Sequence, residues 1–251
     1  MKKPICYNNS IIVGECRPLS ETGIFVSAVI VAAGLSTRME SGTNKNFMQA
    51  GSETVLGHTL DAFLKTGHID QIIVAYRHGE LECARKAAYA SGLNEVTFVE
   101  GGDSRQESVF NALKACDTRC DVVVIHDAAR CCVTPEMIRT SVKAAREHGA
   151  AVCALKTSDT CCIAEDGKVS RYVDRSLMYQ LQTPQTFRYE LIMRAHEEAR
   201  KEAFEGTDDT SLVRRLGEDV FICEGSAENI KITTKDDLKL AVSILAARED
   251  K

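Results

Sequence analysis

Long apolar runs and clustered positive charge are both missing from this sequence. A membrane-spanning helix needs roughly 20 mostly apolar residues, and no stretch of the chain approaches that length. The 31 Lys and Arg residues are outnumbered by 36 Asp and Glu residues, which gives a formal net charge of −5. The chain has no basic patch interleaved with aromatic residues, which is the usual signature of a nucleic-acid-binding protein. We therefore expect neither a membrane nor a nucleic acid among the partners of this protein.

The cysteines do not form a metal-binding pattern. There are 11 of them, an odd number, and no C-x-x-C spacing occurs. Cys131-Cys132 and Cys161-Cys162 are adjacent pairs, and two adjacent cysteines do not easily hold one zinc ion. The favoured interpretation is that the thiols are reduced and serve as small apolar side chains in a cytoplasmic protein.

A chain of 251 residues can bury a substantial core within one domain. The first 25 residues differ from the rest because Pro4, Asn8 and Gly14 interrupt any apolar stretch, so a secretory signal is not indicated. We expect residues 1–25 to be a flexible N-terminal extension and residues 26–251 to form a single domain.

Apolar runs and helix-periodic segments alternate along that domain, which predicts a mostly parallel α/β sheet with helices on both faces. The expected strands are Val26–Ala33, Ile69–Tyr76, Glu95–Glu100, Asp121–His126, Ala150–Leu155, Val220–Glu224 and Asn229–Ile232. The expected helices are Val55–Leu64 (ending at Gly67), Glu80–Ala90, Ser104–Ala115 with a capping box of Ser104 and Glu107, Pro135–His148, Tyr189–Glu202, Asp208–Leu216 and Thr234–Ala247.

The alternation breaks at residues 157–178. Within them, Asp159–Arg175 predicts a β-hairpin around the turn Glu165–Lys168. Two isolated strands bury little surface by themselves. We expect this hairpin to pack against a partner subunit.

The first predicted strand ends in a turn of small residues, Ala32-Ala33-Gly34, which is followed by Arg38 and Lys45. Small residues at the carboxyl end of a strand let backbone N–H groups approach a ligand, and two cations suit a polyphosphate. Neither the P-loop nor the dinucleotide-binding G-x-G-x-x-G pattern is present, which argues against a nicotinamide dehydrogenase. Solvated surface charges are the alternative interpretation of Arg38 and Lys45.

A glycine loop, Gly101-Gly102-Asp103, follows the third predicted strand, at the edge where open parallel sheets bind ligands. Arg105 and Ser108 lie just beyond it. Glycines open backbone groups to a ligand, and Asp103 or Ser108 has the chemistry to contact a base edge. A plain turn with a helix cap is the alternative.

Asp127, within the run His126–Arg130, follows the fourth predicted strand. This position suits a Mg²⁺ contact or a substrate hydroxyl. A helix-capping role for Asp127 is less favoured because Thr134 is available to cap the next helix. His126 is either a ligand or a buried histidine with satisfied hydrogen bonds.

Lys231 lies within the last expected strand, Asn229–Ile232. A buried cation needs a partner, and either a phosphate or an ordinary carboxylate provides one. Thr207–Ser211 is either part of a site or a set of helix-capping residues. Arg175 is either a surface charge or a phosphate clamp that reaches another subunit.

Cations on separate elements, an aspartate and a glycine loop are the groups that nucleotidyl transfer requires. In that reaction a phosphate oxygen attacks the α-phosphorus of a nucleoside triphosphate, and pyrophosphate leaves. Fixed cations and Mg²⁺ stabilise the charge that develops on the phosphoryl oxygens, so no covalent nucleophile is needed. The combination predicts a nucleotidyltransferase.

Seven motifs of this chain resemble, in order, those of the 2-C-methyl-D-erythritol 4-phosphate cytidylyltransferases: AAGLSTRM with NK, EGGDSRQESV, HDAAR, VDR, QTPQTF, TDDTS and ENIKIT. The resemblance runs from about Val26 to the C-terminus. It implies an α/β fold, a Rossmann-like nucleotidyltransferase sheet with a hairpin dimerisation arm at residues 157–178. It also implies transfer of CMP from CTP to methylerythritol phosphate with Mg²⁺, giving 4-diphosphocytidyl-2-C-methyl-D-erythritol and pyrophosphate on the non-mevalonate route to isoprenoid precursors.

The resemblance also implies a role for each matching residue. The catalytic residues would be Arg38, Lys45 and Lys231. CTP would be bound by Ala32, Ala33, Gly34, Gly102, Asp103 and Ser108. Methylerythritol phosphate would be bound by Asp127, Arg130, Thr160, Arg175 and Thr207, with Thr160 and Arg175 supplied by the arm of the other subunit of a homodimer. Asp127 is also the candidate Mg²⁺ ligand, either directly or through water.

The sequence departs from the family pattern at three positions. Ser36 replaces a glycine of the first loop, Asn44 replaces the proline before Lys45, and Cys131 replaces the proline after HDAAR. Loss of a proline predicts a looser loop, by up to ~1 kcal/mol through the entropy of the unfolded chain. A ribitol-5-phosphate cytidylyltransferase is the alternative, since it would share the CTP half of the site. TDDTS and VDR resemble the methylerythritol enzyme more closely.

Overall fold

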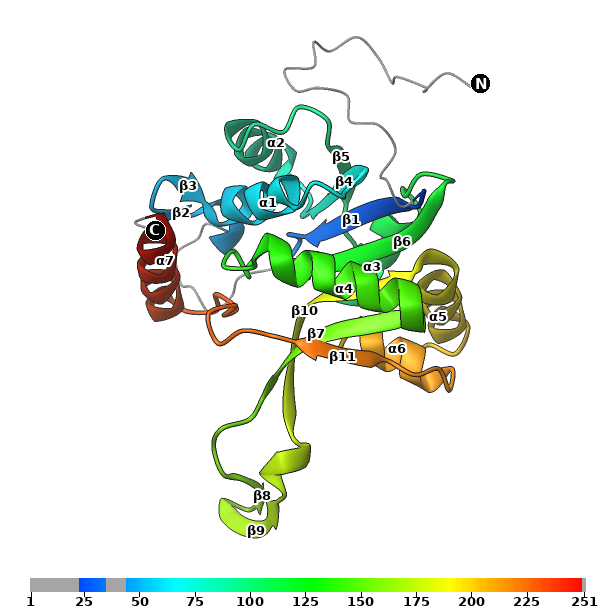
Figure 1. Ribbon diagram of the computed structural model, residues 1–251, viewed down its shortest axis with the longest axis vertical. Helices are drawn as coiled ribbons and strands as arrows, with labels where there is room; N and C mark the ends of the chain where they lie inside the picture. Colours follow the sequence, from blue (N-terminus) through cyan, green and yellow to red (C-terminus); the bar gives the residue numbers. More distant parts are fainter. Residues whose placement is uncertain (1–22, 35–43, 250–251) are drawn as a thin grey trace.

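The computed structural model describes residues 23–34 and 44–249, which form a seven-stranded sheet in the order β11-β7-β10-β6-β1-β4-β5 (Figure 1). The predicted N-terminal extension lies almost wholly outside the described residues. The strands are β1 (Phe25–Val31), β4 (Gln71–Tyr76), β5 (Thr97–Glu100), β6 (Cys120–Asp127), β7 (Ala150–Lys156), β10 (Tyr179–Arg188) and β11 (Phe221–Glu224), with a small separate ribbon of β2 (Gln49–Ala50) and β3 (Glu53–Thr54). No helix in this part of the chain is long and apolar enough to cross a membrane.

Helices cover both faces of the sheet, as the sequence predicted. One face packs against α1 (Val55–Thr66), α2 (Leu81–Ala90) and α4 (Pro135–His148), and the other packs against α3 (Arg105–Leu113), α5 (Tyr189–Lys201) and α6 (Asp209–Arg215). Phe63 and Phe187 are the largest fully buried side chains, one in each layer. Full burial of such a side chain stabilises the fold by roughly 1.5–3 kcal/mol.

Local signals in the sequence explain most helix ends. Thr54 caps α1 by accepting the Gly57 N–H, and Gly67 ends the helix in the left-handed region at φ 76°. Ser104 caps α3 by accepting the Glu107 N–H. The reciprocal bond was expected to run from the Ser104 N–H to the Glu107 carboxylate, but that carboxylate accepts from the backbone N–H of Asp103 instead. The capping box predicted for α3 is therefore wrong in this one bond.

Strand β10 was not predicted, and it makes the sheet mixed. It lies between β6 and β7 and runs antiparallel to both. Its pairing with β7 is interrupted between Leu181 and Gln185, around Pro184, which has no N–H to donate. Several of its buried side chains are polar, including Gln182, Thr183 and Gln185, so neither an apolar run nor regular alternation marks the strand.

The strand predicted at Asn229–Ile232 is wrong, because this segment is an irregular loop. The loop is held by the Ile232 N–H, which bonds the Ala129 carbonyl at 2.9 Å, and by the Asn229 amide, which bonds the Thr183 carbonyl at 2.9 Å. Beyond it, α7 (Lys235–Glu249) packs over Cys131 and Cys132. Lys231 is thus placed between the sheet and the last helix.

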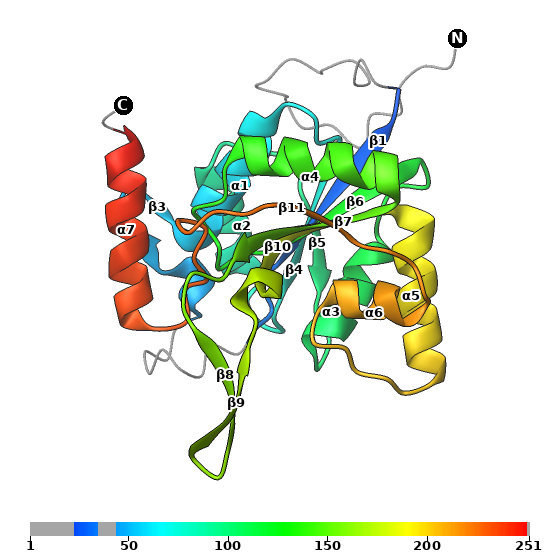
Figure 2. The same cartoon turned by 60° about the horizontal axis from the view of Figure 1, so that its bottom comes forward.

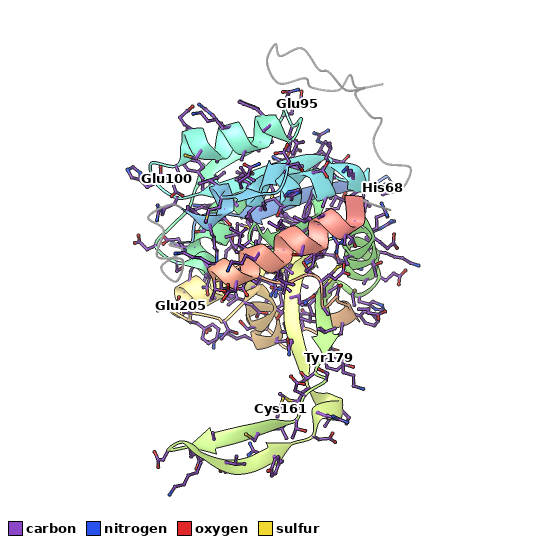
Figure 3. All side chains as sticks on the ribbon, turned by 90° about the vertical axis from the view of Figure 1, so that its left-hand side faces the viewer. His68, Glu95, Glu100, Cys161, Tyr179 and Glu205 are labelled. Carbon is purple, nitrogen blue, oxygen red and sulfur yellow. The ribbon has the colours of Figure 1, made fainter. Side chains whose placement is uncertain are left out.

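The predicted hairpin is present as a two-stranded arm that projects from the body between β7 and β10 (Figures 1 and 2). Its strands are β8 (Cys161–Glu165) and β9 (Lys168–Val173). Asp166 and Gly167, at φ 49° and 75°, form the turn between them. Figure 3 shows how far the arm stands from the sheet, with Cys161 on the arm and Tyr179 at its base.

Candidate active site

A cavity of about 380 Å³ opens at the carboxyl ends of β1 and β6. This is the edge where ligands bind in open parallel sheets. Five segments contribute to its wall: the ends of these two strands, the short turn at Lys45 and Asn46, the glycine loop with the start of α3, and the loop before α7. The lining residues are Val31, Ala33, Gly34, Lys45, Asn46, Gly102, Asp103, Ser104, Arg105, Ser108, Asp127, Ala129, Lys231 and Thr233.

The end of β1 contributes part of the predicted CTP-binding turn. Ala33 and Gly34 line the cavity, whereas Ala32 is fully buried behind them. The Ala32 carbonyl is already occupied, since it accepts hydrogen bonds from the side chains of Asn44 and Asn46. Arg38, one of the predicted catalytic cations, lies outside the described residues.

Side-chain hydrogen bonds of Asn44 support the loop before Lys45, at the position where the family pattern has proline. Its side chain is buried, donates to the Ala32 carbonyl at 3.2 Å and to the Glu80 carboxylate at 2.7 Å, and accepts the Asn46 N–H at 3.1 Å. These bonds replace the constraint that a proline ring would impose. They hold Lys45 at the cavity wall.

The glycine loop allows a close approach of backbone to side chains. A Cβ on Gly101 would lie 2.6 Å from the Ala33 Cβ, and one on Gly102 would overlap the Glu107 side chain. The Gly102 N–H bonds the Ser108 hydroxyl at 3.1 Å, and that hydroxyl donates to the Ser104 carbonyl at 2.8 Å. Ser108 therefore shapes the loop as well as lining the cavity, while Asp103 is exposed at its mouth.

Asp127 is the most strongly perturbed acid of the cavity. Its Oδ2 accepts from Lys231 Nζ at 2.6 Å, and its Oδ1 accepts from Arg105 Nε at 3.1 Å. Burial alone would raise the pKa of this carboxyl, but the charges of Arg105 and Lys231 outweigh it and hold the pKa well below the usual value. Asp127 is therefore an ionised acceptor. Of the two partners that the sequence allowed for Lys231, a phosphate or a carboxylate, the structure shows the carboxylate.

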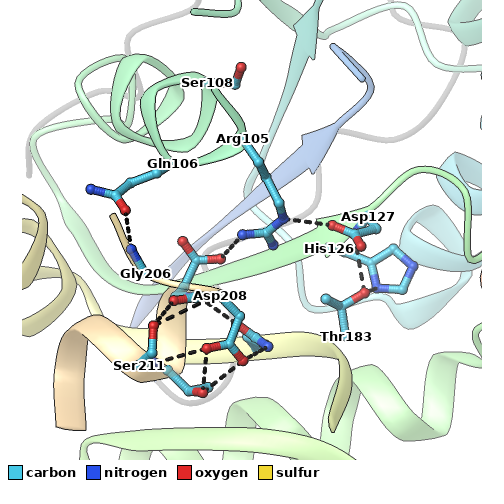
Figure 4. A network of polar contacts seen from close by, with 12 residues as sticks. Arg105, Gln106, Ser108, His126, Asp127, Thr183, Gly206, Asp208 and Ser211 are labelled. Carbon is cyan, nitrogen blue, oxygen red and sulfur yellow. Dashed lines mark hydrogen bonds and ion pairs between the residues drawn. The ribbon is translucent and has the colours of Figure 1, made fainter. Parts of the chain in front are cut away.

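Arg105 was not among the predicted site residues, although it belongs to the EGGDSRQESV motif. Its guanidinium bridges two acids, because Nη1 donates to Asp209 at 2.8 Å while Nε donates to Asp127 (Figure 4). Burial would lower the pKa of Arg105, but the two carboxylates raise it by more than burial lowers it. The guanidinium therefore keeps its positive charge. Arg105 and Asp127 are 22 residues apart in the sequence, so no local pattern predicts this contact.

His126 is a structural residue. Burial lowers its pKa to about 4, so the ring is neutral. Nε2 donates to the Arg130 carbonyl at 3.2 Å, and Nδ1 accepts from the Thr183 hydroxyl at 3.0 Å. Thr183 in turn accepts the Asp127 N–H at 3.1 Å. The histidine thus fixes the backbone beneath Asp127 and is not placed to act as a ligand.

The remaining predicted binding residues do not line the cavity of their own chain. Arg130 donates to the Asn229 carbonyl at 2.8 Å and so supports the loop that carries Lys231. Thr207 is exposed before α6. Thr160 and Arg175 lie on the arm, where both are exposed, and Arg175 donates to the Ser158 carbonyl at 3.1 Å.

Cys131, beside the site, is 2% exposed, and burial together with its neighbour Cys132 raises the pKa of its thiol. A buried protonated thiol is a poor nucleophile. Cys131 therefore packs as a small apolar side chain where the family pattern has proline.

Within residues 23–34 and 44–249, no three His, Cys, Asp or Glu side chains cluster as a metal site. Among the described residues, Asp127 is the one carboxylate deep in the cavity, and both of its oxygens accept from cations. This donor set does not fit a resident metal. It fits a Mg²⁺ ion that arrives with a polyphosphate, since such ions take most of their ligands from phosphate and water.

Comparison with known proteins identifies the family of this chain. Residues 26–247 match the sequence model of the family described as IspD, 2-C-methyl-D-erythritol 4-phosphate cytidylyltransferase. The chain is 40% identical over 220 residues to the enzyme of that name from Clostridioides difficile, covering 87% of this chain and 93% of the relative. It is 42% identical over 219 residues to that from Caldanaerobacter subterraneus, covering 86% and 96%.

Solved structures give the same result. The 4-diphosphocytidyl-2C-methyl-D-erythritol synthase of Anaerococcus prevotii aligns with a TM-score of 0.79 at 31% identity, over 89% of this chain and 99% of that one. The 2-C-methyl-D-erythritol 4-phosphate cytidylyltransferase of Thermus thermophilus aligns with a TM-score of 0.75 at 36% identity, over 89% and 100%. This chain belongs to the 2-C-methyl-D-erythritol 4-phosphate cytidylyltransferase family.

Proposed function

We propose that this protein transfers CMP from CTP to 2-C-methyl-D-erythritol 4-phosphate and releases pyrophosphate. The observation that carries the proposal is the Lys231–Asp127 ion pair, which lines the same cavity as Lys45 and the glycine loop. A cation and an anion side by side match an alcohol phosphate, whose phosphate needs the lysine and whose hydroxyls need the carboxylate. The glycine loop and Lys45 supply the complementary half for a nucleoside triphosphate.

In the proposed reaction, an oxygen of the methylerythritol phosphate attacks the α-phosphorus of CTP. A new P–O bond forms, and the bond between the α-phosphorus and the bridging oxygen to the β-phosphate breaks. Lys45, Lys231 and, by family resemblance, Arg38 would stabilise the pentacoordinate transition state, where negative charge spreads over the phosphoryl oxygens. Loss of one such cation costs on the order of 10²–10³ in rate.

The two halves of the substrate pair have separate partners in this scheme. Ala33, Gly34, Gly102, Asp103 and Ser108 would hold CTP, with Ala32 supporting their turn from behind the wall, and Asp127, Arg130, Thr160, Arg175 and Thr207 would hold the sugar phosphate. When that phosphate binds Lys231, the lysine leaves Asp127, and the substrate hydroxyls take its place on the carboxylate. Mg²⁺ bound with CTP, with Asp127 as its candidate protein ligand, would neutralise part of the triphosphate charge.

We further propose that the protein is a homodimer joined through its arm. The arm presents Val169, Tyr172 and Leu177 to solvent, and Tyr172 and Leu177 are 74% and 76% exposed. An isolated two-stranded hairpin is marginal in water, and a second copy of the chain would cover these side chains. Thr160 and Arg175 would then reach the substrate of the neighbouring subunit, since neither lines the cavity of its own chain.

A cytoplasmic location is part of the same proposal. The cysteines of the described residues are all free. Thiols in this number stay reduced most readily in a reducing compartment.

The decisive assay is pyrophosphate release with CTP, Mg²⁺ and either methylerythritol phosphate or ribitol 5-phosphate, with ATP, GTP and UTP as controls. We expect turnover only with CTP and methylerythritol phosphate. Turnover with ribitol 5-phosphate would keep the CTP half of the proposal and replace the alcohol. No turnover with either alcohol, from folded protein, would reject the proposal.

The shared site can be tested by mixing two variants that are impaired in different parts of it, assayed at a methylerythritol phosphate concentration too low for Arg175→Ala to turn over. Lys45→Ala should abolish turnover and leave the dimer intact, and Arg175→Ala should raise the methylerythritol phosphate KM with little change for CTP. After unfolding and refolding together in equal amounts, about half of the dimers should be mixed, each with one intact site, which gives about a quarter of wild-type activity. Activity no higher than the sum of the separate variants would show that the arm does not serve the neighbouring subunit.

A further inference from the structure

The adjacent acids Asp208 and Asp209 do different things at the start of α6. Asp208 is the cap of this helix: its Oδ1 accepts the Ser211 N–H at 2.9 Å, and the Ser211 hydroxyl completes a capping box. Its other carboxylate oxygen accepts from Gln185 Nε2 at 2.8 Å (Figure 4). The capping interpretation of the TDDTS motif is therefore sufficient for Asp208.

Asp209 has a different environment. Its side chain is 1% exposed and does not line the cavity. Oδ2 accepts from Arg105 at 2.8 Å, and Oδ1 accepts from Nε2 of the fully buried His196 at 3.2 Å. The histidine must be the donor, because a carboxylate only accepts. Gln185 fixes the backbone of Asp209 by accepting its N–H at 3.1 Å.

The two acids that hold Arg105 lie on different sides of the cavity wall. Asp127 lines the cavity and accepts from Nε, whereas Asp209 lies behind the wall and accepts from Nη1. A planar guanidinium bonded at two different nitrogens cannot rotate without losing one bond. The direction of Arg105 toward Asp127 is thus set by Asp209.

We propose that Asp209, held by His196, is a positioning residue for the sugar-phosphate half of the site, acting through Arg105 on Asp127. This inference rests on the proposed function. When a substrate phosphate draws Lys231 away, Arg105 is the one cation among the described residues that still donates a hydrogen bond to Asp127. A fixed Arg105 then keeps the carboxylate ionised and aimed at the substrate hydroxyls.

A purely structural role would give a different result. A buried ion pair is by itself a weak source of stability, since desolvation offsets most of the attraction. If the pair had only a structural role, its removal would lower the free energy of unfolding and change the kinetics of both substrates alike. A positioning role instead predicts a loss confined to the substrate that contacts Asp127.

The test compares Asp209→Asn with Asp208→Asn, a matched control that makes the same isosteric change one residue earlier. The amide at position 209 offers one acceptor and one donor, so either Arg105 or His196 loses its acceptor. We expect Asp209→Asn to lower kcat/KM for methylerythritol phosphate by about 10- to 100-fold, with the KM for CTP within about twofold of wild type. Asp208→Asn should shift the Tm and leave both KM values within about twofold.

A double-mutant cycle shows whether Asp209 acts through Arg105. In an Arg105→Gln background, Asp209→Asn should cost little more, because the group that it positions is already gone. Equal losses for CTP and methylerythritol phosphate, equal losses in the two Asn variants, or full additivity in the cycle would each overturn the inference.

Calorimetric titration of each substrate separates this inference from the proposed function. Wild-type protein that binds neither CTP nor methylerythritol phosphate would reject the proposed function itself. Wild-type protein that binds both, together with an Asp209→Asn variant of unchanged affinity and turnover for methylerythritol phosphate, would reject only the role of Asp209.

Discussion

The change Asn44→Ala tests whether side-chain hydrogen bonds have replaced the missing proline before Lys45. It removes the donor to the Ala32 carbonyl, the donor to the Glu80 carboxylate and the acceptor of the Asn46 N–H. A hydrogen bond to a charged group contributes about 1.5–3 kcal/mol and a neutral one about 0.5–1.5. Ala32 keeps the Asn46 amide and Glu80 keeps its ion pair with Arg77, whereas the N–H of the buried Asn46 loses its side-chain acceptor. The sum for one charged and two neutral bonds is a loss of about 2.5–6 kcal/mol in the free energy of unfolding.

Urea denaturation followed by circular dichroism measures this loss, and the CTP dependence of pyrophosphate release measures its effect on Lys45. The KM for CTP should rise because the loop that carries the lysine loses one of the two side-chain bonds that hold it to the Ala32 carbonyl at the end of β1. Asn44→Asp is the matched comparison, since it keeps the acceptor but places a second carboxylate beside Glu80. It should be at least as unstable as Asn44→Ala at pH 7 and should recover in a Glu80→Gln background. A loss below about 1 kcal/mol for Asn44→Ala would show that these bonds do not hold the loop.

Three further changes test other parts of the structure. Asp237 accepts from Thr233 and Thr234 at the start of α7, and although burial would raise its pKa, these bonds lower it to about 2. Because the folded pKa lies below the unfolded one, wild type should have a higher free energy of unfolding than Asp237→Asn in urea. This difference should be complete above about pH 4 and vanish as the pH falls through about 2. Gly102→Ala should raise the KM for CTP and leave that for methylerythritol phosphate unchanged, because the added Cβ displaces Glu107. Phe187→Ala, which empties a fully buried site, should lower the free energy of unfolding by about 3–5 kcal/mol in the same denaturation assay.

The sequence predicted those elements whose signals are local. Helix α4 begins where Thr134 and Pro135 indicated and has the predicted bounds Pro135–His148, and the arm turns at Asp166-Gly167 as expected. These features depend on φ preferences and caps within a few residues, so they can be identified without knowing the rest of the fold.

Strand β10 could not be identified in this way, because tertiary contacts determine it. Its buried Gln and Thr side chains are hydrogen-bonded to Asn229, His126 and Asp208 from other elements. A polar segment interrupted by Pro184 has the local appearance of a loop. The polar side chains that make β10 hard to predict from the sequence are the same ones that form the hydrogen bonds supporting the site.

The same reason explains the mixed outcome at the site. Lys45, Asp127 and Lys231 were predicted from their positions after or within apolar segments, and the structure places all three on one cavity. The strand assigned to Lys231 was wrong because a short apolar run next to a lysine also fits a loop tied to the sheet by Ile232. Arg105 and Asp209 meet only in the fold, so the pattern gave no sign of their pairing.

The position of Lys231 late in the chain has a consequence for biosynthesis. All seven strands of the sheet are complete by Glu224, before the Lys231 loop and α7 have been synthesised. The chain leaves the ribosome from its N-terminal end, so the Lys231 loop and α7 emerge after every strand of the sheet, and Lys231 is the later of the two cavity lysines to emerge. Catalytic competence would then arise only when α7 docks on Cys131 and Cys132, which makes the C-terminal helix the final assembly step of the reaction centre.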